Sequence, residues 1–140
     1  MSKIAVVYWS ATGNTETMAN KVAEGAKAAG ADTSLFAASD FNGDMMDEYD
    51  AVAFGCPAMG AEELEEEEFQ PMFDTCLPRL SGKKIALFGS YDWGDGEWMR
   101  TWEETSKGAG AVFAHDSVIC NNTPDEDGEA QCAELGKALA

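Results

Sequence analysis

Three short and almost continuous apolar runs constrain the fold more than any other feature of the sequence. They occupy residues 4–8 (IAVVY), 51–55 (AVAFG) and 84–90 (KIALFGS), and segments with helical spacing separate them. Unbroken apolar strands are typical of parallel sheets that are covered on both faces, because neither face of such a strand meets water. The pattern therefore predicts an α/β domain in which strands and helices alternate along the chain.

The segments between these runs complete the pattern. Met18, Val22 and Ala26 recur every fourth residue until Gly30, which predicts the first helix. The other expected elements are strands at 33–37 and 111–120 and helical segments at 41–49, 69–80, 96–108 and 125–139. Residues 33–37 form the weaker strand and are expected near an edge, and prolines interrupt the segment 69–80. We predict one doubly wound domain over residues 1–140, because no repeat or linker divides the chain.

The charge of the chain limits its partners. Nine basic residues against 26 acidic residues give a net charge of −17 at pH 7. Nucleic acids and anionic membranes bind basic surfaces, so neither is expected as a partner. A partner protein with a basic patch would be attracted, and the attraction would weaken in salt. Solubility alone is the alternative explanation of the acidity.

The sequence shows no membrane, export or metal signal. No apolar run approaches the roughly 18 residues of a membrane helix, and the first residues lead directly into a strand pattern, so a cytoplasmic location is expected. The four cysteines show no C-x-x-C spacing and make a poor zinc set with the single histidine, so no metal is predicted. The cysteines are expected to be buried, and His115 to lie at the surface or an edge.

Neutral hydrogen-bonding side chains follow the first apolar run. Four of the six residues at 10–15 (SATGNT) have a hydroxyl or amide group, and none is charged. A helix beginning near Asn14 would add free N–H groups, and Gly13 would allow a left-handed turn. Capping alone would need about one of these side chains, and a P-loop would need a lysine, which is absent between Lys3 and Lys21. The segment therefore predicts a site for a terminal monophosphate.

Two further loops follow the third and fourth strands. Ligands of such sheets bind at the carboxyl ends of the strands, so all three loops are expected at one site. The loop CPAMGAEELEEEEF (56–69) places Met59 at a turn, and the loop SYDWGDGEWM (90–99) places Trp93 between turn residues. Met59 and Trp93 could cover the two faces of a flat aromatic ring, or could pack only on each other.

These motifs together resemble the short-chain bacterial flavodoxins across essentially the whole chain. The matching stretches are VVYWSATGNTE, GCPAMG, LFGSYDWGDGEWM and NNTPDE. The resemblance implies a flavodoxin-like, five-stranded parallel sheet of order 2-1-3-4-5 with helices on both faces. It also implies non-covalently bound FMN in a monomeric, low-potential electron carrier rather than an enzyme. Such a carrier moves single electrons between redox partner proteins as the flavin cycles between semiquinone and hydroquinone.

The resemblance assigns roles to individual residues. The expected FMN-binding residues are Ser10, Ala11, Thr12, Gly13, Asn14, Thr15, Pro57, Ala58, Met59, Gly60, Ala61, Glu62, Ser90, Tyr91, Asp92, Trp93, Gly94 and Asn122. Residues 10 and 12–15 would hold the phosphate, and Met59 and Trp93 would cover the two faces of the flavin ring. Gly60 would lie beside the flavin N5, and Glu62 would accept a hydrogen bond from N3–H. Ser90 and Asn122 would lie near the ribityl chain and the polar edge of the ring.

Two positions depart from the pattern of the family. Ala61 stands where close relatives often have a polar residue or a second turn-former, and Asp92 stands where they tend to have glycine. Asp92 would bring a carboxylate near the pyrimidine edge of the flavin. The acidic run at 62–68 would also disfavour a negatively charged reduced flavin and make it a stronger reductant. The same run is expected in a solvated first helical turn, which the helix dipole favours.

The family also implies a turn that changes with the redox state. The peptide after the glycine turns its carbonyl towards the flavin N5 once that nitrogen gains a proton. If Gly60 and Ala61 are the central residues, one form of the turn needs a positive φ at Ala61 and the other needs it at Gly60. A positive φ is strained at alanine and free at glycine, so the flipped form is expected to be favoured.

Two other functions remain compatible with the residues. A flavin-dependent quinone or nitro reductase would oxidise NADH without a partner protein, but no second glycine-rich loop offers a nicotinamide site. A phosphate- or nucleotide-binding regulatory module would be colourless and would take up no FMN. A visible spectrum with flavin bands would separate this last alternative from the other two.

Overall fold

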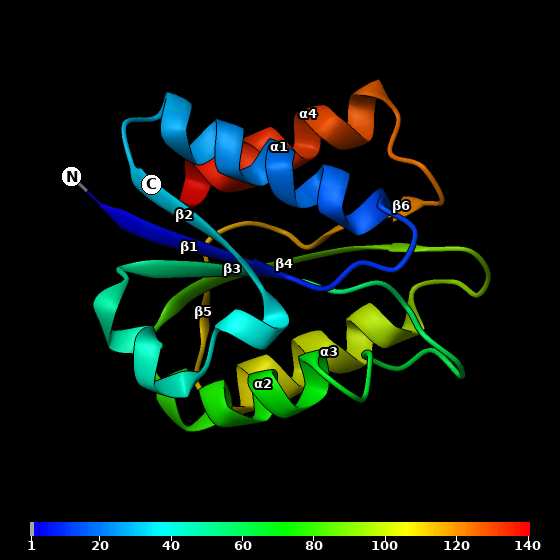
Figure 1. The fold of residues 1–140 in the computed structure, drawn as a ribbon, viewed down its shortest axis with the longest axis horizontal. Helices are drawn as coiled ribbons and strands as arrows, with labels where there is room; N and C mark the ends of the chain where they lie inside the picture. Colours follow the sequence, from blue (N-terminus) through cyan, green and yellow to red (C-terminus); the bar gives the residue numbers. More distant parts are fainter. Residues whose placement is uncertain (1) are drawn as a thin grey trace.

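The computed structural model describes residues 2–140, and a parallel β-sheet lies at its centre (Figure 1). Its strands are β1 (Lys3–Tyr8), β2 (Asp32–Ala37), β3 (Ala51–Gly55), β4 (Lys84–Tyr91), β5 (Val112–Phe113) and β6 (Val118–Asn121). They pair in the order β2-β1-β3-β4-β5, and β6 also pairs with β4; all of these pairings are parallel. The predicted strand order is confirmed, with the weaker second strand at an edge.

Helices cover both faces of the sheet, as predicted. They are α1 (Asn14–Ala28), α2 (Phe69–Cys76), α3 (Glu97–Gly108) and α4 (Glu126–Leu139), with 3-10 segments at Ala38–Asp40, Gly43–Glu48 and Leu77–Arg79. Figure 1 shows α1 and α4 on one face and α2 and α3 on the other. The helices α1 and α4 pack closely, because Gly25 and Gly136 leave room for backbone: a Cβ at either glycine would overlap a carbonyl oxygen of the facing helix.

The sheet separates two apolar clusters. Ile4, Val6 and Met18 belong to the cluster under α1 and α4, whereas Val7 and Phe54 belong to the cluster under α2 and α3. Successive strand residues thus point to opposite faces, and both faces are buried, which explains the unbroken apolar runs. Edge-to-face aromatic contacts fill the second cluster, with ring centroids 5.1–5.7 Å apart, among Phe54, Phe69, Phe73 and Trp102.

Two elements differ from the prediction. The expected fifth strand at 111–120 is divided into β5 and β6, which pair with successive parts of β4. The intervening segment AHDS (114–117) is largely polar, so it lacks the β-branched side chains that favour a strand. The expected helix at 69–80 ends at Cys76 and continues as a 3-10 turn, because Pro78 cannot donate a backbone hydrogen bond.

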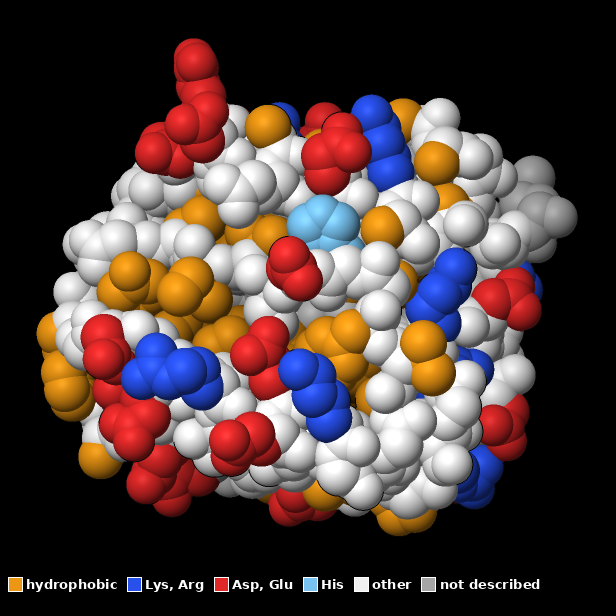
Figure 2. Space-filling view, turned by 180° about the vertical axis from the view of Figure 1, so that it is seen from behind, with side chains coloured by type: hydrophobic (Ala, Val, Ile, Leu, Met, Phe, Trp, Pro, Cys, Tyr) orange, Lys and Arg blue, Asp and Glu red, His pale blue; other side chains and the backbone are white. Residues whose placement is uncertain are grey.

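The cysteines and the histidine lie where the sequence places them. All four cysteines are free and buried, and burial raises the pKa of Cys76 to about 11 and that of Cys132 to about 12. Such thiols stay protonated and unreactive near neutral pH. His115 is half-buried in the segment between β5 and β6, on the face seen in Figure 2, where acidic side chains are widely spread.

Two searches of residues 2–140 gave negative results. None of the helices there is both long and apolar enough to cross a membrane. The same residues contain no group of three or more His, Cys, Asp or Glu side chains that could hold a metal ion.

Candidate functional site

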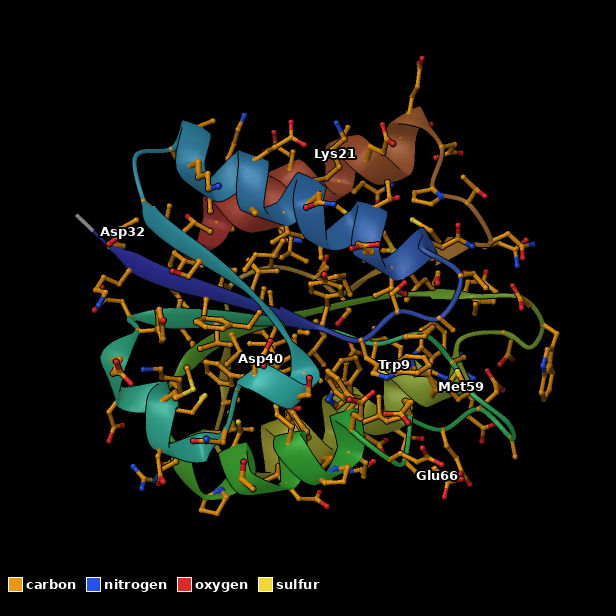
Figure 3. All side chains as sticks on the ribbon, viewed as in Figure 1. Trp9, Lys21, Asp32, Asp40, Met59 and Glu66 are labelled. Atoms are coloured by element: carbon orange, nitrogen blue, oxygen red, sulfur yellow. The ribbon has the colours of Figure 1, made fainter. Side chains whose placement is uncertain are left out.

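The loops after β1, β3 and β4 meet at the carboxyl ends of these strands and enclose a hollow. We name them loop one (residues 9–13), loop three (56–68) and loop four (92–96). The hollow is lined by Ser10, Ala11, Thr12, Thr15, Pro57, Ala58, Met59, Ser90, Tyr91 and Asp92. All of these residues belong to the predicted FMN-binding set. Figure 3 shows Trp9 and Met59, from two of the loops, at this end of the molecule.

Loop one is arranged to receive an anion. Gly13 has a φ of +97°, and Asn14 begins α1 directly after it. Ser10 Oγ accepts the N–H groups of Gly13 (3.1 Å) and Glu16 (3.2 Å), which folds the loop over the helix end. Ser10 therefore caps α1, and its hydroxyl proton remains available to a ligand.

Four backbone N–H groups of this region make no hydrogen bond within residues 2–140. They belong to Ala11, Thr12, Asn14 and Thr15. Free N–H groups at a helix N-terminus, together with the positive end of the helix dipole, are a common seat for phosphate. The expected helix start near Asn14 is confirmed, and with it the feature on which the phosphate prediction depends.

Thr15 and Ser90 connect the start of α1 to the end of β4. Their hydroxyl oxygens lie 2.9 Å apart, and the N–H of Ser90 donates to Thr15 Oγ1 at 3.4 Å. The two side chains are only 1% and 5% exposed. Buried polar groups are costly unless they are hydrogen-bonded, so this pair holds the start of α1, which follows loop one, against the end of β4, which precedes loop four.

Loop three contains a tight turn around Gly60, Ala61 and Glu62. The N–H and C=O groups of Met59 and Glu63 bond to each other in both directions, at 2.8 and 2.9 Å. The φ angle is +51° at Gly60 and +55° at Glu62, and is not positive at Ala61. The positive φ at Gly60 is free of side-chain strain and matches the form of the turn that was expected to be favoured. The turn differs from the expected one in length, because three residues rather than two lie between the paired Met59 and Glu63. At Glu62 it costs about 1–2 kcal/mol, which the sequence did not indicate.

The carboxylate of Glu62 connects loop three to the start of α3. Glu62 Oε1 accepts the N–H of Glu97, the first residue of α3, at 3.1 Å. A Cβ added at Gly94 would lie 2.6 Å from the same oxygen, so glycine makes room for the carboxylate there. The predicted contact of Glu62 with the flavin N3–H stays a prediction, and the carboxylate has further lone pairs for it.

The acidic run of loop three is not uniformly solvated, which corrects part of the expectation. Glu65 is 7% exposed, and its carboxylate accepts the N–H groups of Glu67, Glu68 and Phe69, each at 2.8 Å. Burial alone would raise the pKa of Glu65, but the three donors together hold it below its ordinary value. Glu65 thus caps α2, which begins at Phe69, and holds loop three in place.

Trp9 is a residue of this region that the sequence prediction missed. Its indole N–H donates to Glu68 Oε1 at 3.1 Å, which connects loop one to the end of loop three. A tryptophan directly after an apolar strand suggests core packing, so the sequence offers no signal for this contact.

The remaining predicted residues are not among those that line the hollow. Trp93 is 63% exposed and forms no aromatic ring pair within residues 2–140, whereas Met59 is half-buried. Trp93 is therefore not buried by packing on Met59, which was the alternative to covering a ring ligand. Asp92 is exposed, and Asn122 has a φ of +58° and donates its N–H to the carbonyl of Tyr91 at 2.7 Å. A largely exposed tryptophan that follows Asp92, a lining residue of the hollow, fits a flat ring ligand.

A second hollow lies between loop three, α2 and α3. Its lining is mainly apolar and includes Leu64, Phe73, Trp98 and Trp102. Thr101 and Thr105 bring hydroxyl groups to it, but Glu62 and Glu63 also line it, and the free N–H groups at the start of α1 do not belong to it. It therefore does not match the predicted phosphate site.

Comparison with known proteins identifies the family. A model of the flavodoxin family matches residues 6–136. The flavodoxin of Clostridium beijerinckii is 48% identical over 135 residues, which cover 96% of this chain and 97% of that protein. The chain belongs to the flavodoxin family. The flavodoxin of Megasphaera elsdenii is 46% identical over 137 residues and 98% of both chains.

Solved structures agree with this assignment. The solution structure of two-electron reduced Megasphaera elsdenii flavodoxin superposes with a TM-score of 0.90 at 46% identity, over 97% of each chain. A flavodoxin from the domain Archaea gives a TM-score of 0.86 at 26% identity, over 99% of this chain and 96% of the other. Flavodoxins bind FMN and transfer electrons rather than catalyse a reaction of their own, so this flavodoxin is an FMN-binding electron carrier. The reductase and regulatory alternatives are set aside on this ground.

Proposed function

We propose that this flavodoxin is one FMN-binding domain over its whole length and that the hollow between its three loops is the FMN site. The phosphate would lie on loop one, held by the free N–H groups and by the side chains of Ser10, Thr12, Asn14 and Thr15. The flavin ring would lie between loops three and four, where Met59 and Trp93 cover its faces. When bound, FMN supplies the one-electron chemistry, and the protein binds, orients and shields it.

One observation above all supports this placement. Four N–H groups that make no hydrogen bond within residues 2–140 lie at the start of α1. Three of their residues, Ala11, Thr12 and Thr15, line the same hollow as Ser90 and Met59. Among residues 2–140, no lysine or arginine lines this hollow. Neutral donors at a helix N-terminus bind a terminal phosphate without the lysine and magnesium ion of nucleotide triphosphate sites.

The predicted phosphate seat can be tested by placing one charge in it. Ala11→Asp should abolish or strongly weaken FMN binding to the apo-protein and change the affinity for riboflavin, which has no phosphate, less than threefold. Asn20→Asp, on the exposed face of α1, adds the same charge outside the site and is the control. Equal losses for both flavins in Ala11→Asp would place the phosphate elsewhere.

The partners would be redox proteins that present basic patches near their own electron-transfer sites. The net charge of −17 and the exposed acidic side chains of loop three, beside the ring site, support this proposal. Electron transfer with such a partner should slow as ionic strength rises, with a weaker dependence after Glu66→Gln and Glu67→Gln. A rate independent of salt would contradict the proposal.

We also propose that the carrier acts as a monomer in the cytoplasm, without membrane attachment. Sedimentation should give the mass of one chain, about 15 kDa, at micromolar concentration. Cell fractionation should recover the protein in the cytoplasmic fraction, and recovery with the membranes would contradict this part.

A further inference from the structure

Trp9 joins the phosphate loop to the segment that follows β3. Its backbone N–H donates to the carbonyl of Gly55 at 3.0 Å, and its indole N–H donates to Glu68 Oε1 at 3.1 Å. The ring is half-buried against the apolar cluster under α2 and α3. Both donors of Trp9 therefore bond to groups at the two ends of loop three.

The acceptor of the indole N–H is itself fixed. Glu68 is the residue before α2, and its backbone N–H donates to the buried carboxylate of Glu65 at 2.8 Å. An exposed glutamate on a mobile loop would lose side-chain entropy in such a bond. Here the capped start of α2 holds the backbone of Glu68, so less freedom is lost when its carboxylate accepts from Trp9.

The position of Trp9 controls that of Ser10, the next residue. Ser10 Oγ accepts the N–H groups of Gly13 and Glu16 and so sets the shape of loop one. A shift of Trp9 would move Ser10 and disturb both of these bonds.

We propose that Trp9 and Glu68 are positioning residues for the phosphate of FMN: their hydrogen bond holds Ser10 in place and thereby the free N–H groups of loop one. The inference rests on the placement of the phosphate proposed above. Neither residue needs to contact the cofactor, and neither belongs to the predicted binding set.

The charge of Glu68 allows an experiment to distinguish a positioning role from direct repulsion between its carboxylate and the phosphate. A carboxylate near a phosphate repels it, so loss of the charge alone would strengthen FMN binding. Loss of a positioning acceptor would weaken FMN binding instead. The sign of the change after Glu68→Ala therefore distinguishes the two effects. Glu67→Ala is the matched control, since Glu67 is an exposed neighbour and the indole N–H of Trp9 donates to Glu68.

The test compares FMN with riboflavin on four variants of the apo-protein: Trp9→Phe, Glu68→Ala, the double variant and Glu67→Ala. Trp9→Phe and Glu68→Ala should each weaken FMN binding about threefold to tenfold, as loss of one hydrogen bond implies. Riboflavin affinity should change less than twofold. The double variant should bind FMN no more weakly than the weaker single variant, because both remove the same bond.

A second readout needs no flavin. Amide hydrogen exchange at Gly13 and Glu16 in the apo-protein should accelerate in Trp9→Phe and Glu68→Ala and stay unchanged in Glu67→Ala. Equal losses for FMN and riboflavin, additive losses in the double variant, or unchanged exchange at Gly13 and Glu16 would overturn the proposal. If the wild-type protein bound FMN no better than riboflavin, the phosphate placement would be wrong, and the exchange data would still decide whether the pair holds loop one.

Discussion

Glu65→Gln should destabilise the fold more than any other single charge removal in the acidic run. The native carboxylate is buried and accepts three backbone N–H groups at 2.8 Å. Glutamine keeps one acceptor oxygen but turns an NH2 group towards at least one of these donors. A hydrogen bond to a charged group contributes about 1.5–3 kcal/mol, and a helix cap about 1 kcal/mol.

These contributions overlap, because one carboxylate makes all three bonds. We therefore expect a loss of about 1–2 kcal/mol for Glu65→Gln and about 2–4 kcal/mol for Glu65→Ala, which leaves all three donors without an acceptor. Domains of this size are typically stable by only about 5–15 kcal/mol, so the effect is large. Urea unfolding of the apo-protein, followed by circular dichroism, measures it.

Glu66→Gln is the matched control, since Glu66 is an exposed neighbour whose side chain points outwards in Figure 3. Its stability should stay within about 0.5 kcal/mol of the wild type, as is usual for surface substitutions. If Glu65→Gln unfolded at the same urea concentration as Glu66→Gln, the capping role of Glu65 would be refuted.

The pH dependence gives an independent check on Glu65. Its pKa is lower in the folded protein than in the unfolded chain, so its contribution is full above the unfolded pKa, about 4.3. The contribution is lost as pH falls towards the folded pKa. The stability difference between the wild type and Glu65→Gln should therefore be constant above about pH 5.5 and shrink below about pH 4.

Three further substitutions test the ring site. Trp93→Ala should weaken FMN binding by about 1–3 kcal/mol, since a stacking partner is lost, and fluorescence titration would show an unchanged Kd if Trp93 lay off the ring. Asp92→Asn should raise the second one-electron potential by about 10–40 mV, as for removal of one exposed charge, and a fall in that potential would contradict the electrostatic argument. Gly60→Ala meets no atom within 4 Å but must adopt a φ of +51°, so it should strain the turn by about 1–2 kcal/mol. The unflipped form of the family's turn needs its positive φ at Ala61 instead, so this strain falls on the flipped form alone. In redox titration it should lower the first one-electron potential by roughly 40–90 mV, and no fall would mean that the turn does not respond to the flavin.

The sequence predicted the sheet because its signal is local and repeated. The runs containing Val6, Val52 and Leu87 are almost continuously apolar, which is typical of strands buried on both faces. Gly13 and Asn14 likewise predict a turn and the start of a helix, because the signal for each lies within a few neighbouring residues. The interruption of the fifth strand was missed, because the segment 114–117 lies between two strand-like stretches and the edge tolerates a break.

The contacts inside the site could not be predicted in the same way. Glu65 is one of six glutamates between 62 and 68, and the sequence does not show which of them turns inwards. Its burial depends on where α2 begins, and element boundaries are the least certain part of a sequence-based prediction. The positive φ of Glu62 is equally invisible, since glutamate has no preference for that conformation.

Three side-chain hydrogen bonds hold the site together, each between residues that lie in one of its loops or in the helix or strand next to one. Thr15 with Ser90, Glu62 with the N–H of Glu97, and Trp9 with Glu68 span 75, 35 and 59 residues of sequence. Each bond needs two strands to be neighbours or near neighbours before it can form, so the strand order creates it. Because these bonds order the loops as part of folding, less conformational entropy is left to be lost when a ligand binds. Weakening one bond should then raise the Kd for FMN even where the altered side chain does not touch the cofactor.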